Sequence, residues 1–490
     1  MVSERPLSLN PLIDAADPAV VDVGDLLYRS LLKLDSTGYP RPDLAATFTV
    51  SPSGLVYTVS LKPDLVWSNG TPITADDVVA TTKFALSPQA SDPTLSTALR
   101  GVTVAGDQSI ITFTLATPRA SFASTLTELP ILPLGGLSEA ATLATAASPT
   151  KPLPTSGPYD VQSTSALAID LQPNPHAARR PGITSYELRL FLTFVDAAGV
   201  FARGNVNAVL ATTPEELTTL LHVKGAQAET MTTPDFVDMI FNERVPALAD
   251  PVVRHAIGSA INRASIVAGA LDRSGGVVQT GPFSMGLPWV GRPAPEAVSP
   301  AVSEEVLTHD GWVPGPDGTR RKGSAPLAFT LDVPAIDPLP VVAAEVAGQL
   351  GAIGVRVTVK VVAPSNFLNG TLDTGDFQLA IDSWSPGPDP DVSAFWRSNA
   401  VPPRGYDVSG GPVDPFLDSA LDTLAESPDL MLRLHAAGQV ATLLAADAPA
   451  VFLYTPQVSM VFGSPMPVAP MPALGDEGDR YNDIASWQLR

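Results

Sequence analysis

The sequence of 490 residues contains no cysteine. Disulfide scaffolds, thiolate zinc sites and cysteine nucleophiles all require a thiol, so all three are excluded. The absence fits an oxidising compartment in which no free thiol is wanted, and it also fits chance.

Charge is scarce as well, because only 16% of the residues are charged. The charged residues are 29 Lys or Arg and 50 Asp or Glu, which gives a net charge of −21. This negative field repels phosphate backbones and anionic lipid headgroups. The composition therefore argues against a nucleic-acid partner and against docking on an anionic membrane surface.

Long apolar runs are also missing. The uncharged run 458–475 is interrupted by prolines, so we expect no membrane-spanning helix. The first residues do not have the pattern of a signal peptide. We expect that the N-terminus has been trimmed and that an export signal was removed with it.

The composition and patterning that are present predict a large folded protein. Hydrophobic residues make up 45% of the chain, and its length suggests about three domains. Alternating strand and helix patterns predict a mixed α/β (α+β) fold with mixed sheets. The clearest expected strands are 55–61, 110–115, 377–384 and 450–454, and the clearest expected helices are 74–84, 251–271, 338–350 and 414–444.

Catalytic and metal-binding motifs are not evident. The five histidines stand singly, and the segment 156–159 is better explained as a turn that enters a strand than as a serine nucleophile. Asp389 and Asp391 supply only two carboxylates, whereas a calcium loop needs more oxygen ligands. We therefore expect no catalytic residue, no metal and no cofactor, and we do not expect an enzyme.

Several motifs occur in the order that one protein family shows. They are Asn10-Pro11, Tyr57 to Lys62, Val66 to Val78 with its Trp-Ser-Asn-Gly-Thr-Pro run, Ser156 to Tyr159, Asn242 to Arg263, Gly311 to Gly323, Leu350 to Val355, Trp384 to Pro390, and Asp414 to Leu453. This order resembles the family 5 extracellular solute-binding proteins of ABC importers, which bind oligopeptides, dipeptides or nickel. The resemblance covers essentially the whole chain.

The resemblance implies a two-lobed fold of the periplasmic-binding-protein type with an extra inserted domain and a hinged cleft. Lobe I would comprise 1–41, 152–235 and 456–490, the inserted domain 42–151, and lobe II 236–455. The ligand would lie between the lobes, where hinge bending encloses it.

The resemblance also implies that two backbone segments flank a bound peptide as added strands. One contains Tyr28, Arg29 and Ser30, and the other contains Trp384, Ser385, Gly387 and Asp389. The second segment departs from the family's peptide binders. Gly387 stands where they place an aspartate for the ligand's ammonium group, and Pro386 and Pro388 remove two backbone donors.

Further candidate contacts are aromatic or cationic. Phe283 and Tyr406 are expected near the ligand, and Trp396, like Trp384, is open to two interpretations, cleft lining or core packing. Arg397 and Arg404 are candidates for binding a ligand carboxylate, and an ion pair within the protein is the alternative for each.

The sequence thus predicts a monomeric extracytoplasmic receptor. It would capture a peptide or a similar small polar solute and deliver it to the membrane permease of an ABC importer. The composition suggests lipid anchoring at the outer face of the cytoplasmic membrane. The alternative is an envelope sensor or scaffold on the same fold with altered or lost ligand binding, which the missing aspartate at position 387 would favour.

Overall fold

The computed structural model describes residues 8–489 except 16, 36, 139–140, 143–144, 146–151, 273, 285–297, 403–404, 464–466, 469–477 and 482. The chain forms two compact units, each of which is described by itself. Unit 1 comprises 1–231, 426–428 and 458–490, and unit 2 comprises 232–425 and 429–457. Lobe II was predicted at 236–455, and the separation of 42–151 from lobe I within unit 1 stays a prediction.

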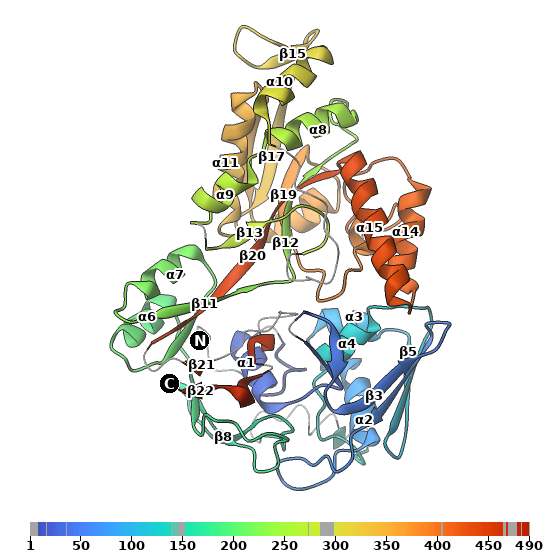
Figure 1. The fold of residues 1–490 in the computed structure, drawn as a ribbon, viewed down its shortest axis with the longest axis vertical. Helices are drawn as coiled ribbons and strands as arrows, with labels where there is room; N and C mark the ends of the chain where they lie inside the picture. The colour runs from blue at the N-terminus through green and yellow to red at the C-terminus, as the bar shows by residue number, and fades with distance from the viewer. Residues whose placement is uncertain are drawn as a thin grey trace. The chain divides into compact units, whose positions relative to one another are not determined.

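Unit 1 combines short helices with several small sheets (Figure 1). Its helices are α1 (Pro18–Leu27), α2 (Ala75–Ala85), α3 (Pro93–Leu99), α4 (Phe122–Glu128), α6 (Phe194–Ala202) and α7 (Pro214–Leu221), and η2 (Gly478–Tyr481) and η3 (Ile484–Ser486) are 3-10 turns. Its strands are β1 (Leu32–Leu34), β2 (Pro40–Pro42), β3 (Ala45–Val50), β4 (Val56–Leu61), β5 (Val102–Asp107), β6 (Ile110–Leu115), β7 (Tyr159–Thr164), β8 (Ala168–Pro173), β9 (Tyr186–Arg189), β10 (Ala208–Ala211), β21 (Pro467–Val468) and β22 (Gln488–Leu489).

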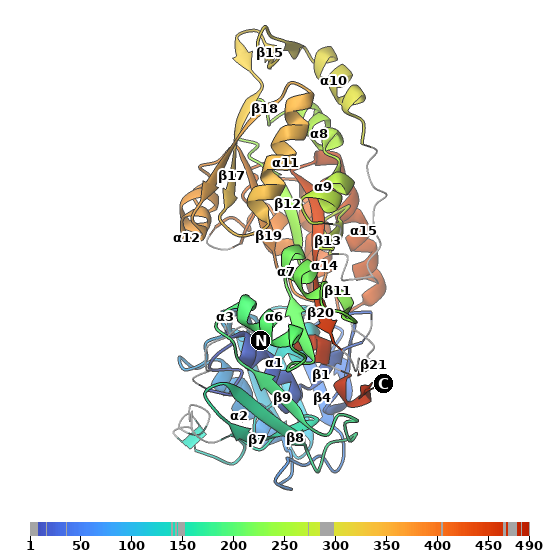
Figure 2. The same cartoon turned by 90° about the vertical axis from the view of Figure 1, so that its left-hand side faces the viewer.

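Two antiparallel sheets of unit 1 follow sequence patterns directly. One has the strand order β3-β4-β6-β5, and the other has the order β7-β8-β9, which is visible in Figure 2. Strand β4 alternates buried and half-buried residues, as the apolar–polar alternation of 55–61 predicts. Trp67, in the loop after β4, is 1% exposed.

The start of α2 confirms the predicted helix boundary at Thr74. One carboxylate oxygen of Asp77 accepts the Thr74 N–H at 2.8 Å, which satisfies a donor at the helix N-terminus. The other oxygen accepts the Gly135 N–H at 2.8 Å. Asp77 therefore caps the helix and fixes a neighbouring loop at the same time.

Unit 2 is built on one large mixed sheet. Its strands are β12 (Phe236–Phe241), β13 (Gly276–Val278), β17 (Ala328–Pro334), β18 (Arg356–Val362), β19 (Leu379–Trp384) and β20 (Ala450–Phe462), with the small hairpin strands β14 (Val313–Pro314), β15 (Arg320–Lys322) and β16 (Ala325–Pro326). The order of the main strands is β20-β12-β19-β17-β18. Two strands run across the unit boundary, because β11 (Gln227–Thr232) ends at residue 232 and β20 continues past residue 457.

Helices cover both faces of this sheet (Figure 1). One layer holds α8 (Pro251–Ala260), α9 (Arg263–Gly269) and α11 (Leu339–Ala352), and the other holds α14 (Pro415–Glu426) and α15 (Leu430–Asp447), while α10 (Pro300–His309), α12 (Pro364–Asn366), η1 (Phe367–Leu372) and α13 (Ser393–Trp396) are peripheral or short. Because both faces are covered, every residue of β12 is buried, including Asp238.

Two predicted helices are each divided in the structure. The expected helix 251–271 consists of α8 and α9, because Ile261 is extended and Asn262 accepts the Ser265 N–H to start a new helix. The expected helix 414–444 consists of α14 and α15, since Asp429 caps the second helix just after Pro428. The apolar residues keep their helical spacing across both breaks, so the sequence pattern did not indicate them.

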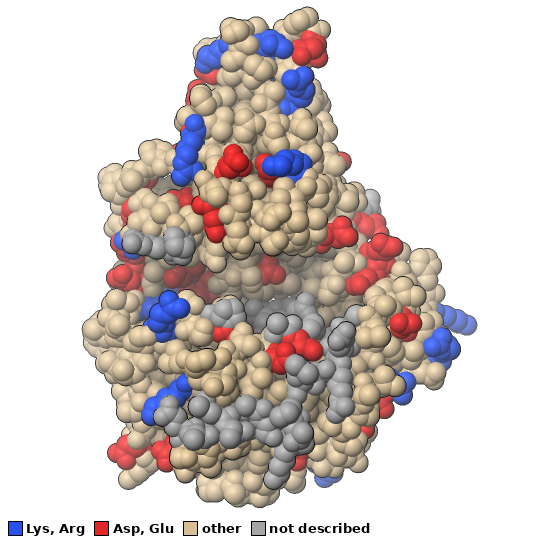
Figure 3. Space-filling view, turned by 180° about the vertical axis from the view of Figure 1, so that it is seen from behind, with Lys and Arg blue, Asp and Glu red and all other residues tan. Residues whose placement is uncertain are grey.

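The surface reflects the low charge content. Figure 3 shows charged side chains standing apart on a face that is largely uncharged. Several buried charged groups form ion pairs. In unit 1, Arg480 of η2 and Asp22 of α1 form an ion pair, and both are at most 2% exposed.

We expect Asp22→Ala to lower the free energy of unfolding by about 3–5 kcal/mol, because it removes the carboxylate that binds the buried Arg480 guanidinium. The control is Glu187→Ala, which removes an exposed ion pair with Arg189 and should change stability by less than about 1 kcal/mol. Urea denaturation of both variants measures the difference. Equal losses would contradict the assignment.

Candidate functional site

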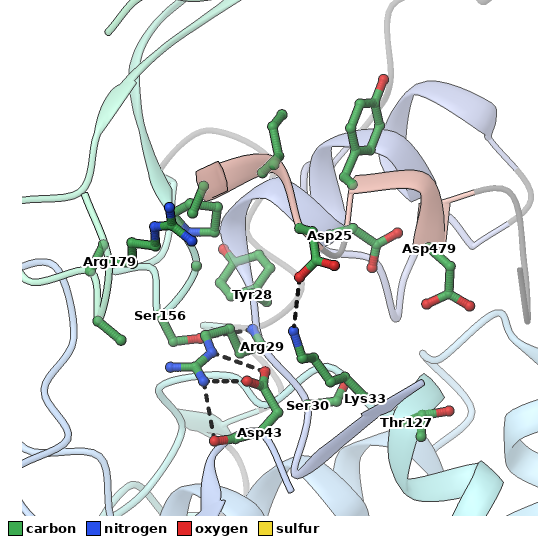
Figure 4. A pocket seen from close by; sticks show the side chains of 18 of the residues that line it. Asp25, Tyr28, Arg29, Ser30, Lys33, Asp43, Thr127, Ser156, Arg179 and Asp479 are labelled. Carbon is green, nitrogen blue, oxygen red and sulfur yellow. Dashed lines mark hydrogen bonds and ion pairs between the residues drawn. The ribbon is translucent and has the colours of Figure 1, made fainter. Parts of the chain in front are cut away.

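Unit 1 contains a cavity of about 280 Å³ beside the end of α1 (Figure 4). Six segments of the chain line it. They include Asp25, Tyr28, Arg29, Ser30, Lys33, Asp43, Thr127, Ser156, Gly157, Pro158, Arg179, Asp479, Tyr481 and Asp483. The cavity thus includes all three residues of the first segment that the sequence predicted to contact ligand.

The close approach of Ser156 and Gly157 positions this segment. Both backbone N–H groups donate to the Leu27 carbonyl, at 3.0 and 2.8 Å, and the Ser156 hydroxyl accepts the Arg29 N–H at 2.9 Å. A Cβ on Gly157 would lie 2.5 Å from the Leu26 carbonyl oxygen, so only glycine allows this approach.

The main chain around Ser30 is paired on one side and open on the other. The Arg29 carbonyl accepts the Ile131 N–H at 3.0 Å, and the Leu31 carbonyl accepts the N–H groups of residues 43 and 45. Within the described parts of the chain, the Tyr28 carbonyl and the Ser30 N–H have no hydrogen-bond partner. These two groups form a short open strand edge that lines the cavity.

Most of the cationic charge in the cavity is already paired. The Arg29 guanidinium binds the Asp43 carboxylate and also donates to the Asp43 carbonyl at 3.1 Å, as Figure 4 shows. Lys33 Nζ lies 3.3 Å from Asp483 Oδ1. Arg29 therefore contributes backbone to the cavity, while its charge is neutralised by Asp43.

The second predicted segment lies in unit 2, at the end of β19. Trp384 is 7% exposed and packs against Phe395 and Tyr406, with ring centroids 5.2 and 5.5 Å apart. Trp396 and Phe283 belong to the same buried cluster. The space among Trp384, Phe395, Trp396 and Tyr406 is only about 10 Å³, at most room for a single water molecule.

Tyr406 differs from the other predicted aromatic residues because it is 44% exposed. It stacks on Phe395 with a centroid distance of 5.7 Å and an interplanar angle of 23°. Of the two interpretations that the sequence left open for Trp384 and Trp396, core packing describes most of their surface. Tyr406 is the ring that this cluster presents to solvent.

The buried carboxylate of Asp238 supports Trp384 and lies beside the half-buried Asp382. Its indole N–H donates to Asp238 at 3.0 Å, and Asp238 on β12 lies directly across from Asp382 on β19. Burial raises the pKa of Asp382 to about 7, and it raises the pKa of Asp238 well above its usual value. The sequence analysis did not identify this pair, because its two members are distant in the chain and join only through strand register.

The loop after Trp384 is accessible at Ser385. Gly387 has a φ of +79°, a conformation that favours glycine. Asp389 is buried and forms an ion pair with Arg433. Its carboxylate is therefore occupied within unit 2.

Arg397 and Arg404 were the two arginines predicted as candidates for binding a ligand carboxylate. Arg397 forms an ion pair with Asp422 at 2.9 Å, which corresponds to the intraprotein alternative. Arg404 lies outside the described residues. Arg179, which lines the unit 1 cavity, was not singled out from the sequence, because no motif distinguishes it from its neighbour Arg180.

The described residues contain no group of three or more His, Asp or Glu side chains arranged to hold a metal ion. None of their helices has the length and apolar character that crossing a membrane requires.

Comparisons with known proteins agree on one family. The model of the bacterial extracellular solute-binding proteins, family 5 Middle, matches residues 39–404. Protein XP55 of Streptomyces lividans is 26% identical over 461 residues, which cover 92% of this chain and 82% of that protein. The oligopeptide-binding protein AppA of Bacillus subtilis is 25% identical over 464 residues, which cover 91% and 84%.

A solved structure shows the same fold. The crystal structure of NikA from Brucella suis, in complex with Fe(III)-EDTA, matches with a TM-score of 0.81 and 18% identity. The match covers 100% of this chain and 99% of that one.

We expect Asp382→Asn to reduce the pH dependence of stability. Asp382 holds its proton up to about pH 7 in the folded protein but only to about pH 4 in the unfolded chain. In this range the folded state binds more protons, so the free energy of unfolding falls as pH rises, by at most about 1.4 kcal/mol per pH unit.

Urea denaturation between about pH 4 and about pH 7 measures this slope for the wild type and the variant. Glu305→Gln removes an exposed carboxylate of α10 in the same unit and serves as the control for lost charge. An unchanged slope in Asp382→Asn would show that Asp382 does not hold the proton.

Proposed function

Because the chain belongs to the bacterial extracellular solute-binding proteins of family 5, we propose that it captures a short peptide, or a similar small polar solute, outside the cytoplasm for an ABC importer. AppA is named as an oligopeptide-binding protein, and NikA was crystallised with a metal chelate. Both the peptide and the small-solute class are therefore represented among its relatives. A binding protein of this kind needs no catalytic group.

The observation that carries the peptide proposal is the open strand edge in unit 1. A peptide has a backbone N–H and C=O at each residue, so it can pair with the Tyr28 carbonyl and the Ser30 N–H in the manner of an added strand. Such pairing gives affinity with little dependence on side-chain identity. The cavity beside the edge, at about 280 Å³, is close to the lower end of the size range of ligand pockets.

Unit 2 offers a different kind of surface. Tyr406 presents an aromatic ring, and Ser385 and Gly387 present accessible main chain. Pro386 and Pro388 have no N–H group, so this segment has fewer donors than an ordinary strand edge. With Asp389 paired to Arg433, we propose that this surface contributes apolar contact and leaves recognition of charge to other residues.

Partner and location follow from the family. We propose that the receptor docks on the permease subunits of its importer and acts as a monomer. Lipid anchoring at the outer face of the cytoplasmic membrane remains a prediction, for which the composition is the support.

The direct test is native mass spectrometry of the protein purified from its own host, before and after mild denaturation. A released peptide or peptide ladder would support peptide capture. A single non-peptide mass would replace the peptide with another solute. No released mass, together with no thermal shift from peptide pools, would contradict solute capture, because a ligand at 100 times its Kd should stabilise the fold by about 2.7 kcal/mol.

We expect Tyr406→Ala to raise the Kd for peptides about tenfold, because the exposed ring supplies aromatic contact area on unit 2. Phe416→Ala is the matched control, since Phe416 of α14 is 76% exposed and lines neither cavity described above. Isothermal titration of both variants with a peptide pool measures the effect. Equal affinities in the two variants would remove Tyr406 from the binding surface.

A further inference from the structure

Three cationic side chains are among the described residues that line the unit 1 cavity, and one of them has no acidic partner in the described parts of the chain. Arg29 is paired with Asp43, and Lys33 is paired with Asp483. Arg179 is exposed and forms no ion pair with any described residue. Figure 4 shows its side chain extending toward Tyr28.

The segment that carries Arg179 is fixed near its start. Asn174 is buried and donates its side-chain N–H to the Gly157 carbonyl at 2.9 Å, while its backbone N–H donates to the Pro158 carbonyl at 3.0 Å. Its side-chain oxygen accepts the His176 N–H at 2.8 Å. The same residues that position Tyr28 therefore also position the segment leading to Arg179.

We propose that Arg179 binds a carboxylate of the ligand and makes the unit 1 cavity selective for solutes with a free carboxylate. This inference rests on the proposed function and deepens it. A guanidinium can bind a carboxylate through two parallel hydrogen bonds, and it stays charged at any physiological pH.

The charge of the cavity favours a carboxylate over a more highly charged anion. Four carboxylates line the cavity, from Asp25, Asp43, Asp479 and Asp483, against three cations. A dianion such as a phosphate monoester would be repelled more strongly by this surplus than a monoanion. A carboxylate needs only the one unpaired cation that is present.

Arg179 would also set the direction of a bound peptide. The open edge formed by Tyr28 and Ser30 can pair with a peptide main chain in more than one direction. A terminal carboxylate held at Arg179 selects one of these, because the cavity contains no second unpaired cation among its described lining residues.

The experiment compares two probes on the full chain. A pool of alanine-based di- to pentapeptides is prepared as free acids and, separately, as C-terminal amides. Affinities are measured by isothermal titration for the wild type, Arg179→Gln, Arg179→Lys and Arg180→Gln. Arg180 is adjacent, equally exposed and outside the cavity lining, so it is the matched control for the loss of one positive charge.

We expect the wild type to prefer the free acids about tenfold, which suits a charge-assisted contact that is partly screened by solvent. Arg179→Gln should bind acids and amides equally, Arg179→Lys should retain part of the preference, and Arg180→Gln should match the wild type. Because Arg179 is exposed, the substitutions should leave the unfolding midpoint nearly unchanged.

The outcomes separate the inference from the function on which it rests. Equal wild-type affinity for acids and amides, or an unchanged preference in Arg179→Gln, would overturn the role of Arg179 and leave peptide capture standing. The same loss in Arg180→Gln would reduce the effect to general charge and overturn it as well. Failure of the wild type to bind either pool would contradict peptide capture, and the inference with it.

Discussion

The unit 1 cavity depends on one close contact, in which Ser156 and Gly157 pack against the last turn of α1. Their N–H groups satisfy the Leu27 carbonyl at a helix end, where carbonyls otherwise lack partners. The same contact engages the Arg29 N–H beside the extended Tyr28, and it leaves the Tyr28 carbonyl and the Ser30 N–H open in residues that line the cavity. Any Cβ at position 157 would separate these segments.

In unit 2, burial leaves a carboxylate without a counter-ion. Helices on both faces of its sheet force Asp238 into the core, where one carboxylate oxygen receives the Trp384 indole N–H and the other has no partner among the described residues. A buried carboxylate without a counter-ion is more stable as the neutral acid, which is why its pKa and that of Asp382 are raised. The orientation of Trp384 is thus coupled to a pair of groups that hold protons.

Local features were predictable from the sequence, and long-range ones were not. The expected helix starts at 74 and 251 were confirmed because capping chemistry is local: Asp77 accepts the Thr74 N–H, and Asp250 accepts the Val252 N–H. The breaks at Asn262 and Pro428 were missed because apolar periodicity continued through them. Family order indicated Tyr28 to Ser30, but the partners of Asp389 and Arg397 are 44 and 25 residues away and could be found only from the fold.

Because charged residues are scarce in this chain, the few charged groups without a partner are the ones available to a ligand. A chain with only 16% charged residues pairs its inner arginines closely, as Arg480, Arg254, Arg433 and Arg29 show. Pairing removes each of them from competition for a ligand, since the carboxylate already present would have to be displaced. Recognition of a charged solute then falls to groups that the fold leaves open, which in the unit 1 cavity are one guanidinium and a short strand edge. Such a site would bind a peptide through its main chain and its terminal carboxylate, and would tolerate variation in the peptide's side chains.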